Sequence, residues 1–433
     1  MWHNLRRALR RALPCAAWCA AMLSGVTGVT PAAAQDTIRT APRTSPDSIA
    51  ARLERAEEMI EFLKQQMADQ SAIAIHTRSR IEVELTGRVL VNAFSNTRRV
   101  TALDAPVFVR PDTAGGPPPG GAGMGIRQTT IGFSAAVADV LGGNLTADVD
   151  ADFYGGQDAR TMTPIVRLRT SRVAIHWPHA DVMVGQDDPL ISTLNPVSLA
   201  AVGVPGFSAA GNLWDWLPQV RLGVHTAGSV RVGLQGAVIA PSAGVPQSSA
   251  DDDLAESARR PYLESRAHLS WGADATAGEI GIGIHEGWLA TPNSTAHRET
   301  RGVGVDAMVP FNRWLEFRGE WYAGDGMRVL GGGAIGQLFD TNNAPVHSAG
   351  FWGQVNVTPV PRVTFGAGYG QDDPADANLP ATARLRNAAA EVHLHIRPGG
   401  PVVLGIEYRR METTYRTGPL VNDHINVAMG IVL

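Results

Sequence analysis

Acidic residues occupy every second position in the segment NLTADVDADFY, and basic residues do so in a segment shortly after it. Asp148, Asp150 and Asp152 are separated by apolar residues, and Arg167 and Arg169 flank a leucine. Because successive side chains of a strand point to opposite faces, both segments predict strands with one charged face and one apolar face. If the two strands form a hairpin, Asp152 and Asp150 lie opposite Arg167 and Arg169 and can form ion pairs. The same charges can instead set up an electric field across a passage beside the strands, and both interpretations stay open.

Covalent chemistry has little support in the rest of the sequence. The chain contains no Gly-x-Ser-x-Gly motif, no His-Glu-x-x-His motif and no zinc-type cysteine pairs. His393 and His395 share a predicted strand face, and residues 251–253 are all aspartates. Solvated side chains are the better interpretation in both cases, because no further metal ligand is identifiable. We therefore predict no metal, no cofactor and no catalytic residue.

Residues 1–34 have the organisation of a secretory signal peptide. Four arginines and no acid precede an apolar run, and PAAA precedes Gln35 as a small-residue cleavage site. A transmembrane helix is the alternative, which the absence of stop-transfer charges disfavours. Both cysteines, Cys15 and Cys19, fall inside this segment, so we expect the mature chain to contain no thiol. Removal also makes the formal net charge more negative than −4, which argues against nucleic acid as a partner.

Residues 35–44 form a Pro/Thr-rich linker, after which the pattern becomes that of a helix. Ser45 followed by Pro46 is an N-cap and first-turn signature. Apolar residues then recur at spacings of four and three, as in a heptad seam. We predict a short coiled-coil helix over residues 45–75 that forms a parallel trimeric bundle. A helix packed against its own domain is the alternative.

From residue 81 to residue 433 the apolar residues recur with a period of two, and we identify sixteen strand segments. Their connections alternate in length, because every odd connection is long and every even one is a short turn. The last long connection, for example, is predicted between residues 411 and 422. Outer-membrane barrels have this arrangement, with short periplasmic turns and long external loops. The predicted fold class is therefore all-β: a 16-stranded antiparallel transmembrane β-barrel, residues 81–433, with a short N-terminal periplasmic coiled-coil helix.

The charged face of each predicted strand must point into this barrel. An arginine on the lipid face costs about 2–4 kcal/mol at the bilayer midplane, whereas a wet interior accepts it. Charges there act on solutes through size exclusion and the shape of the electric field, with no covalent step. The predicted pore-lining residues are Asp148, Asp150, Asp152, Arg167, Arg169, Asp187, Asp188, Arg221, Arg231, Arg266, Glu316, Arg318, Glu320, Glu407 and Arg409.

The third long connection, residues 187–215, is the candidate constriction. It is rich in proline and small residues and is apolar along LAAVGVPGFSAAG. Because exposed loops are usually more polar, we predict that it folds inward against the barrel wall. Asp187 and Asp188 at its start would then lie near the narrowest point. Packing over the rim or at a subunit interface is the alternative.

Aromatic residues gather at the predicted strand ends, where amphipathic rings favour the boundary between water and lipid. We predict one belt at the turn end and a second belt at the loop end. The first contains Trp177, Trp271 and Trp314, and the second contains Tyr154, Trp216, Trp288, Trp321, Tyr322, Tyr369 and Tyr408.

With these features the chain resembles the DcaP-like trimeric porins of Gram-negative outer membranes. IRQTTIGF (Ile126 to Phe133) resembles the family's Arg-Gln-x-x-x-Gly-Phe second strand, and DVMVGQDDPLISTLNP (Asp181 to Pro196) resembles its Val-Gly-Gln strand and third loop. The chain departs from the family pattern in ending at Leu433 where a phenylalanine is usual. The resemblance implies passive uptake of small, often anionic, solutes through a homotrimer in the outer membrane.

Three other functions remain as alternatives. A substrate-selective channel would show an arginine ladder without opposing acids for phosphate, or an aromatic slide for sugars, and neither pattern is clear. A barrel enzyme would need a nucleophile beside a histidine such as His225, His285 or His347, and the sequence places none there. A structural protein that tethers the envelope would need a longer helix than residues 45–75.

Overall fold

The computed structural model describes residues 75–76, 81–116, 119–155, 164–243, 252–273, 276–292 and 296–433. The chain divides into two units, residues 1–73 and 74–433, and everything below concerns the second. The predicted signal peptide and linker lie outside the described residues and stay predictions. So does the predicted helix, except that Ile75, its last residue, belongs to strand β1 (Ile75–His76). The predicted bound at residue 75 is therefore wrong for Ile75 itself.

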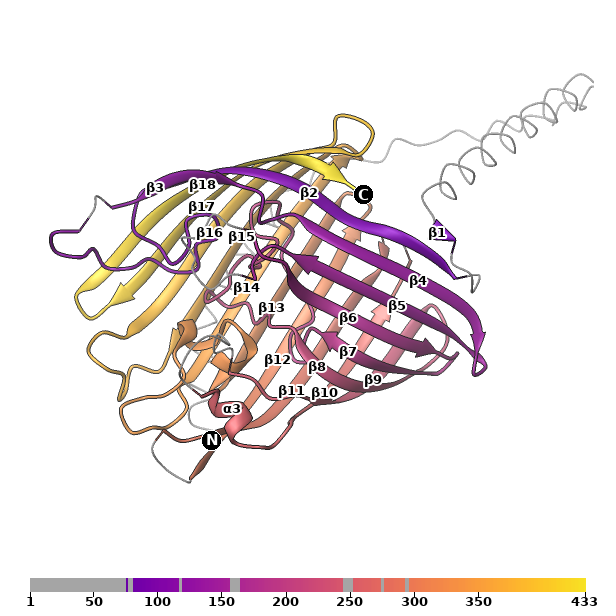
Figure 1. Ribbon diagram of the computed structural model, residues 1–433, viewed down its shortest axis with the longest axis horizontal. Coiled ribbons are helices and arrows are strands. Elements are labelled where there is room, and N and C mark those ends of the chain that lie inside the picture. The colour runs from indigo at the N-terminus through magenta and orange to yellow at the C-terminus, as the bar shows by residue number, and fades with distance from the viewer. Residues whose placement is uncertain are drawn as a thin grey trace, which may run out of the picture. The chain divides into compact units, whose positions relative to one another are not determined.

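Sixteen antiparallel strands close a barrel, as predicted (Figure 1). Two short further strands, β1 and β3 (Gly121–Gly125), both pair with the first barrel strand. The barrel strands are β2 (Glu82–Asn96), β4 (Thr130–Val140), β5 (Gly143–Asp152), β6 (Arg167–His176), β7 (Ala180–Asp187), β8 (Leu217–His225), β9 (Val230–Ile239), β10 (Tyr262–Trp271), β11 (Gly278–Ala290), β12 (His297–Asn312), β13 (Leu315–Asp325), β14 (His347–Val360), β15 (Val363–Pro374), β16 (Arg384–Ile396), β17 (Val402–Tyr415) and β18 (Gly418–Val432).

The last strand closes the barrel by pairing with the first. β18 lies antiparallel to β2, with Val432 opposite Arg88 and His424 opposite Asn96. The Leu433 amide then donates to the Gly87 carbonyl at 2.9 Å. Closure matters because a sheet with an open edge would leave backbone N–H and C=O groups without partners in a lipid environment.

Short turns and long loops segregate to opposite ends of the barrel, which we name the turn end and the loop end. Turns such as residues 141–142, 313–314 and 361–362 lie at the turn end. The predicted alternation fails at the last connection, where β17 and β18 are joined by residues 416–417 alone. Both strands run further than the sequence indicated, because Thr413 and Thr414 continue the pairing with Leu420 and Pro419 beyond the apolar stretch.

The outer face of the barrel is apolar and the inner face is polar. On β18, Ile425, Val427 and Met429 expose 49%, 48% and 59% of their surface, whereas His424 and Asn426, which alternate with them, are buried. The predicted period of two is therefore confirmed on this strand. Among the described residues, no helix is both long and apolar enough to cross a membrane.

The predicted belt at the loop end is partly wrong. Tyr369 and Tyr408 are exposed on the outer face, as expected. Tyr154, Trp216 and Tyr322 are instead buried, and each makes its contacts on the inner side. Spacing alone could not separate these two sets, because buried rings with a hydrogen-bonding group also occur at strand ends.

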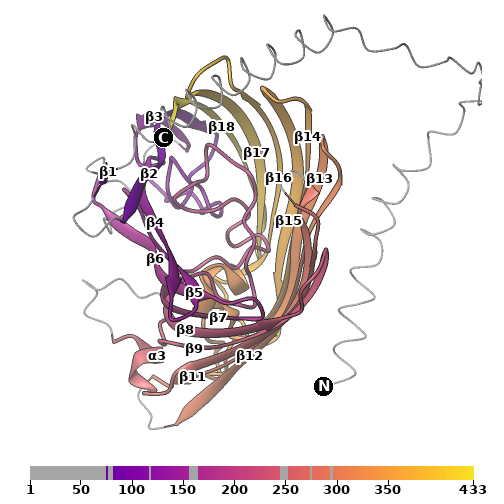
Figure 2. The same ribbon diagram turned by 90° about the vertical axis from the view of Figure 1, so that its right-hand side faces the viewer.

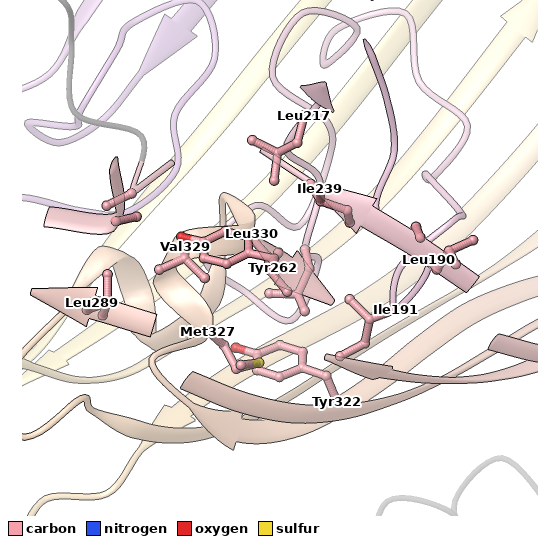
Figure 3. Close-up of a cluster of buried hydrophobic side chains, with 14 residues drawn as sticks. Leu190, Ile191, Leu217, Ile239, Tyr262, Leu289, Tyr322, Met327, Val329 and Leu330 are labelled. Carbon is pink, nitrogen blue, oxygen red and sulfur yellow. The ribbon is translucent and has the colours of Figure 1, made fainter. Parts of the chain in front are cut away.

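A hydrophobic cluster fills the interior at the loop end (Figure 3). It joins both ends of the third loop, at Leu190 and Leu213, to the 3-10 helix η2 (Met327–Leu330) of the loop after β13. The amides of Trp214 and Asp215 both donate to the Leu330 carbonyl, at 3.0 and 3.3 Å. Two loops thus pack on each other inside the barrel mouth. Nearby, the short helix α3 (Leu254–Ser257) is capped by Asp253, which accounts for one of the three consecutive aspartates.

Candidate functional site

Residues 188–216, which connect β7 and β8, fold into the barrel (Figure 2). We call this segment the inner loop. Its side chains and backbone contact inward-facing residues of strands on the far wall, so the predicted inward fold is confirmed and the rim alternative is wrong. The sequence signal was composition, because small and apolar residues allow a loop to pack against a wall.

Three carboxylates from three strands receive hydrogen bonds from the backbone of the inner loop. Glu264 on β10 accepts from the Ile191 amide at 3.2 Å. Glu320 on β13 accepts from the Leu194 amide at 2.9 Å. Glu407 on β17 accepts from the amides of Leu199 and Ala200 and from the Ser198 hydroxyl at 2.6 Å. A buried amide without a partner costs about 1–3 kcal/mol, so these carboxylates hold the loop against the wall.

Three side-chain amides extend this row of contacts around the barrel. Gln354 on β14 accepts from the Val197 amide at 2.8 Å. Asn92 on β2 donates to the Leu199 carbonyl at 2.9 Å. Gln128, just before β4, accepts from the amides of Val202 and Gly203 at 2.8 and 3.0 Å. The inner loop is therefore fastened to the wall from β10 round to β4.

Glycines on the wall let the inner loop approach closely. The Phe207 ring stacks on Trp352 with centroids 5.9 Å apart and lies against β15. A Cβ atom on Gly368 would come 2.8 Å from this ring, and one on Gly370 would come 2.9 Å from it. Because real side chains do not approach so closely, only glycine fits at these two positions.

A polar cavity of about 510 Å³ remains on the side of the barrel that the inner loop leaves free. The inner loop contributes Asp188, Asn195 and Trp216 to its lining. The strands contribute polar and charged side chains, including Thr86, Ser134, Asp148, Asp150, Arg169 and Arg172. The cavity thus lies between the inner loop and strands β2, β4, β5 and β6.

The hairpin of β5 and β6 carries the ion pairs that the spacing predicted. Asp152 lies opposite Arg167, and their side chains approach to 2.5 Å. Arg169 lies 2.8 Å from Asp150 and 3.8 Å from Asp152. The acidic residues of β5 and the basic residues of β6 therefore form ion pairs, and the guanidinium groups lie against the wall that bounds the cavity.

Arg172 lines the cavity but is not among the predicted pore-lining residues. Arg172 lies 2.9 Å from Asp148 and 3.1 Å from Asp187. Strict alternation after Arg169 would point it outward, but a bulge between Asp150 and Ala151 adds one residue to β6 and reverses the phase. No residue pattern in β6 signals this bulge, so the sequence alone could not have found it.

Two other predicted residues join this cluster. Asp187 at the end of β7 also lies 3.2 Å from Arg221 on β8. Asp188 begins the inner loop, and its backbone carbonyl accepts from Arg221 at 2.7 Å. Burial, followed by the neighbouring Asp187 charge, raises the pKa of the Asp188 carboxyl to about 7. This group therefore changes its charge close to neutral pH.

The remaining predicted residues lie on other parts of the inner wall. Arg231 is exposed near the turn end, and Glu316 and Arg318 pair at 2.7 Å below the inner loop. Arg266 contacts Asp306 and Glu279 at 2.5 and 2.7 Å. Arg409 contacts Glu391 at 2.8 Å. Arg266, Glu320, Glu407 and Arg409 are all buried, so they contact protein groups more than the cavity. Whether the fifteen residues line a pore stays a prediction.

Two arginines also contact aromatic rings beside the cavity. The guanidinium groups of Arg167 and Arg169 lie 5.2 and 4.8 Å from the Trp216 ring. Trp214 packs edge-on against Trp216 with centroids 5.3 Å apart. These contacts fix the position of Trp216, which borders the cavity from the inner loop.

Glu264, His285 and Thr300 are hydrogen-bonded in the same order as the acid, histidine and hydroxyl of a hydrolase triad. His285 Nδ1 lies 2.8 Å from Glu264 Oε1, and its Nε2 lies 3.1 Å from the Thr300 hydroxyl. The exposed fractions are 5%, 1% and 0% for Glu264, His285 and Thr300, so no substrate reaches the hydroxyl. The group instead orients Glu264 toward the Ile191 amide. Among the described residues, no three His, Cys, Asp or Glu side chains converge in a way that could hold a metal ion.

A closed barrel with a loop folded into it and an ion-paired inner wall defines a porin-type fold. No protein-family model matches the sequence, and no curated protein matches it significantly.

Solved structures do match, and they show which porin-type fold this is. The outer membrane channel DcaP of Acinetobacter baumannii aligns with a TM-score of 0.65 at 14% identity, over 83% of this chain and 99% of that chain. OprB of Pseudomonas putida aligns with a TM-score of 0.52 at 9% identity, over 81% and 94%. An anion-selective porin from Comamonas acidovorans aligns with a TM-score of 0.50 at 13% identity, over 82% and 100%. The chain therefore has a DcaP-like porin-type fold.

Proposed function

We propose that this protein is an outer-membrane porin that lets small hydrophilic solutes, anions included, diffuse passively through its barrel. The observation that carries the proposal is the polar cavity between the inner loop and strands β2, β4, β5 and β6. A water-soluble protein would have no physical reason to expose an apolar outer face around a polar interior, whereas a membrane barrel needs this arrangement. In this proposal the turn end faces the periplasm, the loop end faces outward, and the inner loop narrows the passage.

The ion pairs at the cavity support general diffusion over phosphate selectivity. Arg169 and Arg172 present guanidinium groups to the cavity, which gives small anions favourable contacts. Each of these arginines also lies within 3 Å of a carboxylate, so the wall is not a purely basic ladder. A sugar-selective channel would need a row of rings, and among the described residues lining the cavity Trp216 alone is aromatic.

A planar lipid bilayer tests the proposal directly. We expect the refolded protein to produce stepwise, ohmic conductance, and the variant Trp216→Ala to conduct more because the ring borders the cavity. Trp288→Ala on the outer face of β11 is the matched control and should leave the conductance unchanged. A correctly folded protein that never conducts contradicts the proposal. Lipid hydrolysis by such a sample would instead support the enzyme alternative.

We also propose that the protein forms a homotrimer whose subunits meet along β5–β9. These five strands contain no Phe, Tyr or Trp, whereas β10, β11, β13, β14, β15 and β17 all carry them. Membrane barrels place aromatic rings where their surface meets the lipid headgroups, so a face without rings is suited to protein contact. Native mass spectrometry should give three chains, and Val184→Arg on β7 should reduce this to one.

A further inference from the structure

The charges that line the cavity between the inner loop and strands β2, β4, β5 and β6 come close to cancelling. Arg169 and Arg172 carry two positive charges, whereas Asp148, Asp150 and Asp188 carry three negative ones when all are ionised. The net charge of the described lining is therefore −1, two minus three. A cavity that favoured free anions alone would need the opposite sign. This lining instead suits a solute that carries both charges.

Both arginines keep part of their guanidinium group free for a solute. The Arg172 Nε donates to Asp148 at 2.9 Å and its Nη1 to Asp187 at 3.1 Å, while its Nη2 has no partner among the described residues. In Arg169, Nη1 lies 2.8 Å from Asp150, and no described residue accepts a hydrogen bond from Nη2. Charge-assisted hydrogen bonds from guanidinium to carboxylate are among the strongest in proteins. The β6 wall therefore offers two donors to a carboxylate in the cavity.

Asp188 lines the same cavity from the inner loop and is the acid that lacks a cation. Its Oδ1 atom is buried and has no hydrogen-bond partner. Arg221 donates to the Asp188 backbone carbonyl at 2.7 Å, but its ion pair is with Asp187 at 3.2 Å. In the described part of the chain Asp188 forms no ion pair, whereas Asp148 and Asp150 each have one. Because a buried carboxylate without a partner costs free energy, a cation bound at Asp188 would be stabilising.

The free cationic and anionic groups thus come from two different parts of the cavity lining. The guanidinium groups belong to β6, and the Asp188 carboxylate belongs to the inner loop. An α-amino acid carries a carboxylate and an ammonium group on one carbon atom, so a single small molecule can contact both parts. An ion with one charge would contact one part and leave the other without a partner. The volume of about 510 Å³ lies within the range of about 300–1,000 Å³ that is common for ligand sites.

We propose that this cavity binds zwitterionic solutes of the amino-acid type, with the carboxylate on Arg169 and Arg172 and the ammonium group on Asp188. The proposal rests on the function proposed above, because it names a class of solute for the same cavity. Free anions still enter, but they bind more weakly because the lining presents carboxylates to them without a compensating ammonium group.

Saturation-transfer NMR with the whole protein in dodecyl maltoside micelles tests the proposal with three related probes. L-glutamine carries both charges, glutaramate lacks the ammonium group, and γ-aminobutyramide lacks the carboxylate. At about pH 8 the Asp188 carboxyl, whose pKa is about 7, is ionised. We expect glutamine to bind at least about tenfold more tightly than either analogue under this condition.

Substitutions separate the two halves of the site. Asp188→Asn should lower the affinity for glutamine to that for glutaramate, because the ammonium group loses its partner. The double variant Arg169→Gln/Arg172→Gln should lower it to that for γ-aminobutyramide, because the carboxylate loses its donors. Asp112→Asn and Arg98→Gln are the matched controls, since these two residues pair with each other at 3.1 Å and do not line the cavity. Folding of each variant is checked by its heat-modifiable migration in gels.

The three probes also distinguish the outcomes. Equal affinity for glutamine and glutaramate would mean an anion site, and equal affinity for glutamine and γ-aminobutyramide would mean a cation site. Either result would overturn the proposal, as would the absence of binding or an unchanged preference for glutamine in Asp188→Asn. Bilayer conductance is measured on the same samples. A protein that binds glutamine but never conducts contradicts the channel function alone, and one that conducts without preferring glutamine contradicts the zwitterion site alone.

Discussion

The Ser198 hydroxyl donates to a carboxylate oxygen of Glu407 at 2.6 Å, although 209 residues separate the two in sequence. The same carboxylate accepts from the amides of Leu199 and Ala200 and lies 3.0 Å from His395 Nε2. One side chain of β17 thus satisfies three donors of the inner loop. A loop held in this way keeps a fixed shape and can define the width of a passage.

Replacing this carboxylate should loosen the inner loop. In Glu407→Ala the Leu199 amide loses its acceptor, at about 1–3 kcal/mol for a buried group left without a partner, whereas the Ala200 amide keeps the Ser198 hydroxyl oxygen at 3.0 Å. We expect hydrogen exchange at the Leu199 amide to speed up at least tenfold, with a smaller change at Ala200, and the single-channel current to become noisier.

Glu412→Ala is the control for this experiment. Glu412 lies further along the same strand, half-exposed and 3.6 Å from Arg386. Its removal should change neither the exchange at Leu199 and Ala200 nor the current noise. Equal exchange in both variants would mean that Glu407 does not hold the loop.

Charge selectivity should depend on the pair that the β6 bulge creates. Arg172→Gln leaves Asp148 and Asp187 without this cation and should shift the reversal potential in a salt gradient toward cations. Asp148→Asn should shift it toward anions. One unit charge at about 4 Å in water corresponds to ~1 kcal/mol, so each permeability ratio should change by up to about fivefold.

Arg301→Gln is the control for the selectivity measurement. Arg301 pairs with Glu299 at 2.7 Å and is more than half exposed, and it does not line the cavity. Its replacement should leave the reversal potential unchanged. Shifts of the same sign in Arg172→Gln and Asp148→Asn would disprove a role for this pair in selectivity.

Selectivity should also change with pH through Asp188. Because burial raises the pKa of this carboxyl from 3.8 to about 7, the cavity gains a negative charge as pH rises through neutrality. Cation preference should increase between about pH 6 and pH 8, and Asp188→Asn should remove this dependence. The stability of the fold should change with pH in the opposite direction to the cation preference. A raised pKa means that the folded state binds the Asp188 proton more tightly than the unfolded state does. The stabilisation from this bound proton is therefore lost as pH rises from about 4 to about 7. A wild-type reversal potential that is flat over this range would contradict the assignment.

The barrel was predictable from sequence because its two signals are local. Alternation of apolar and polar residues needs only neighbouring positions, and turn residues mark the strand ends. The inward fold of the third loop was also readable from its apolar composition. The fastening of that loop was not, because Glu264, Gln354 and Glu407 find their partners across the barrel and no spacing rule links them. The inward position of Arg172 could not be predicted for a different reason. The bulge in β6 reverses which side chains face inward in the rest of that strand.

The assignment of the outer face to lipid is tested by one substitution on each face of the wall. Ile282 lies on β11 between the rows of Trp271 and Trp288 and exposes 49% of its surface on the outer face. Ile282→Arg should lower the free energy of unfolding in phospholipid vesicles by about 2–4 kcal/mol, because the guanidinium would face hydrocarbon near the midplane. Ser134→Arg is the matched control, since Ser134 lines the cavity and lies opposite Asp148 in the register, where a cation meets water and a carboxylate. Urea unfolding of both variants, followed by tryptophan fluorescence, gives the comparison. If Ser134→Arg were the more damaging of the two, the apolar face would not face lipid, and the channel function would lose its physical basis.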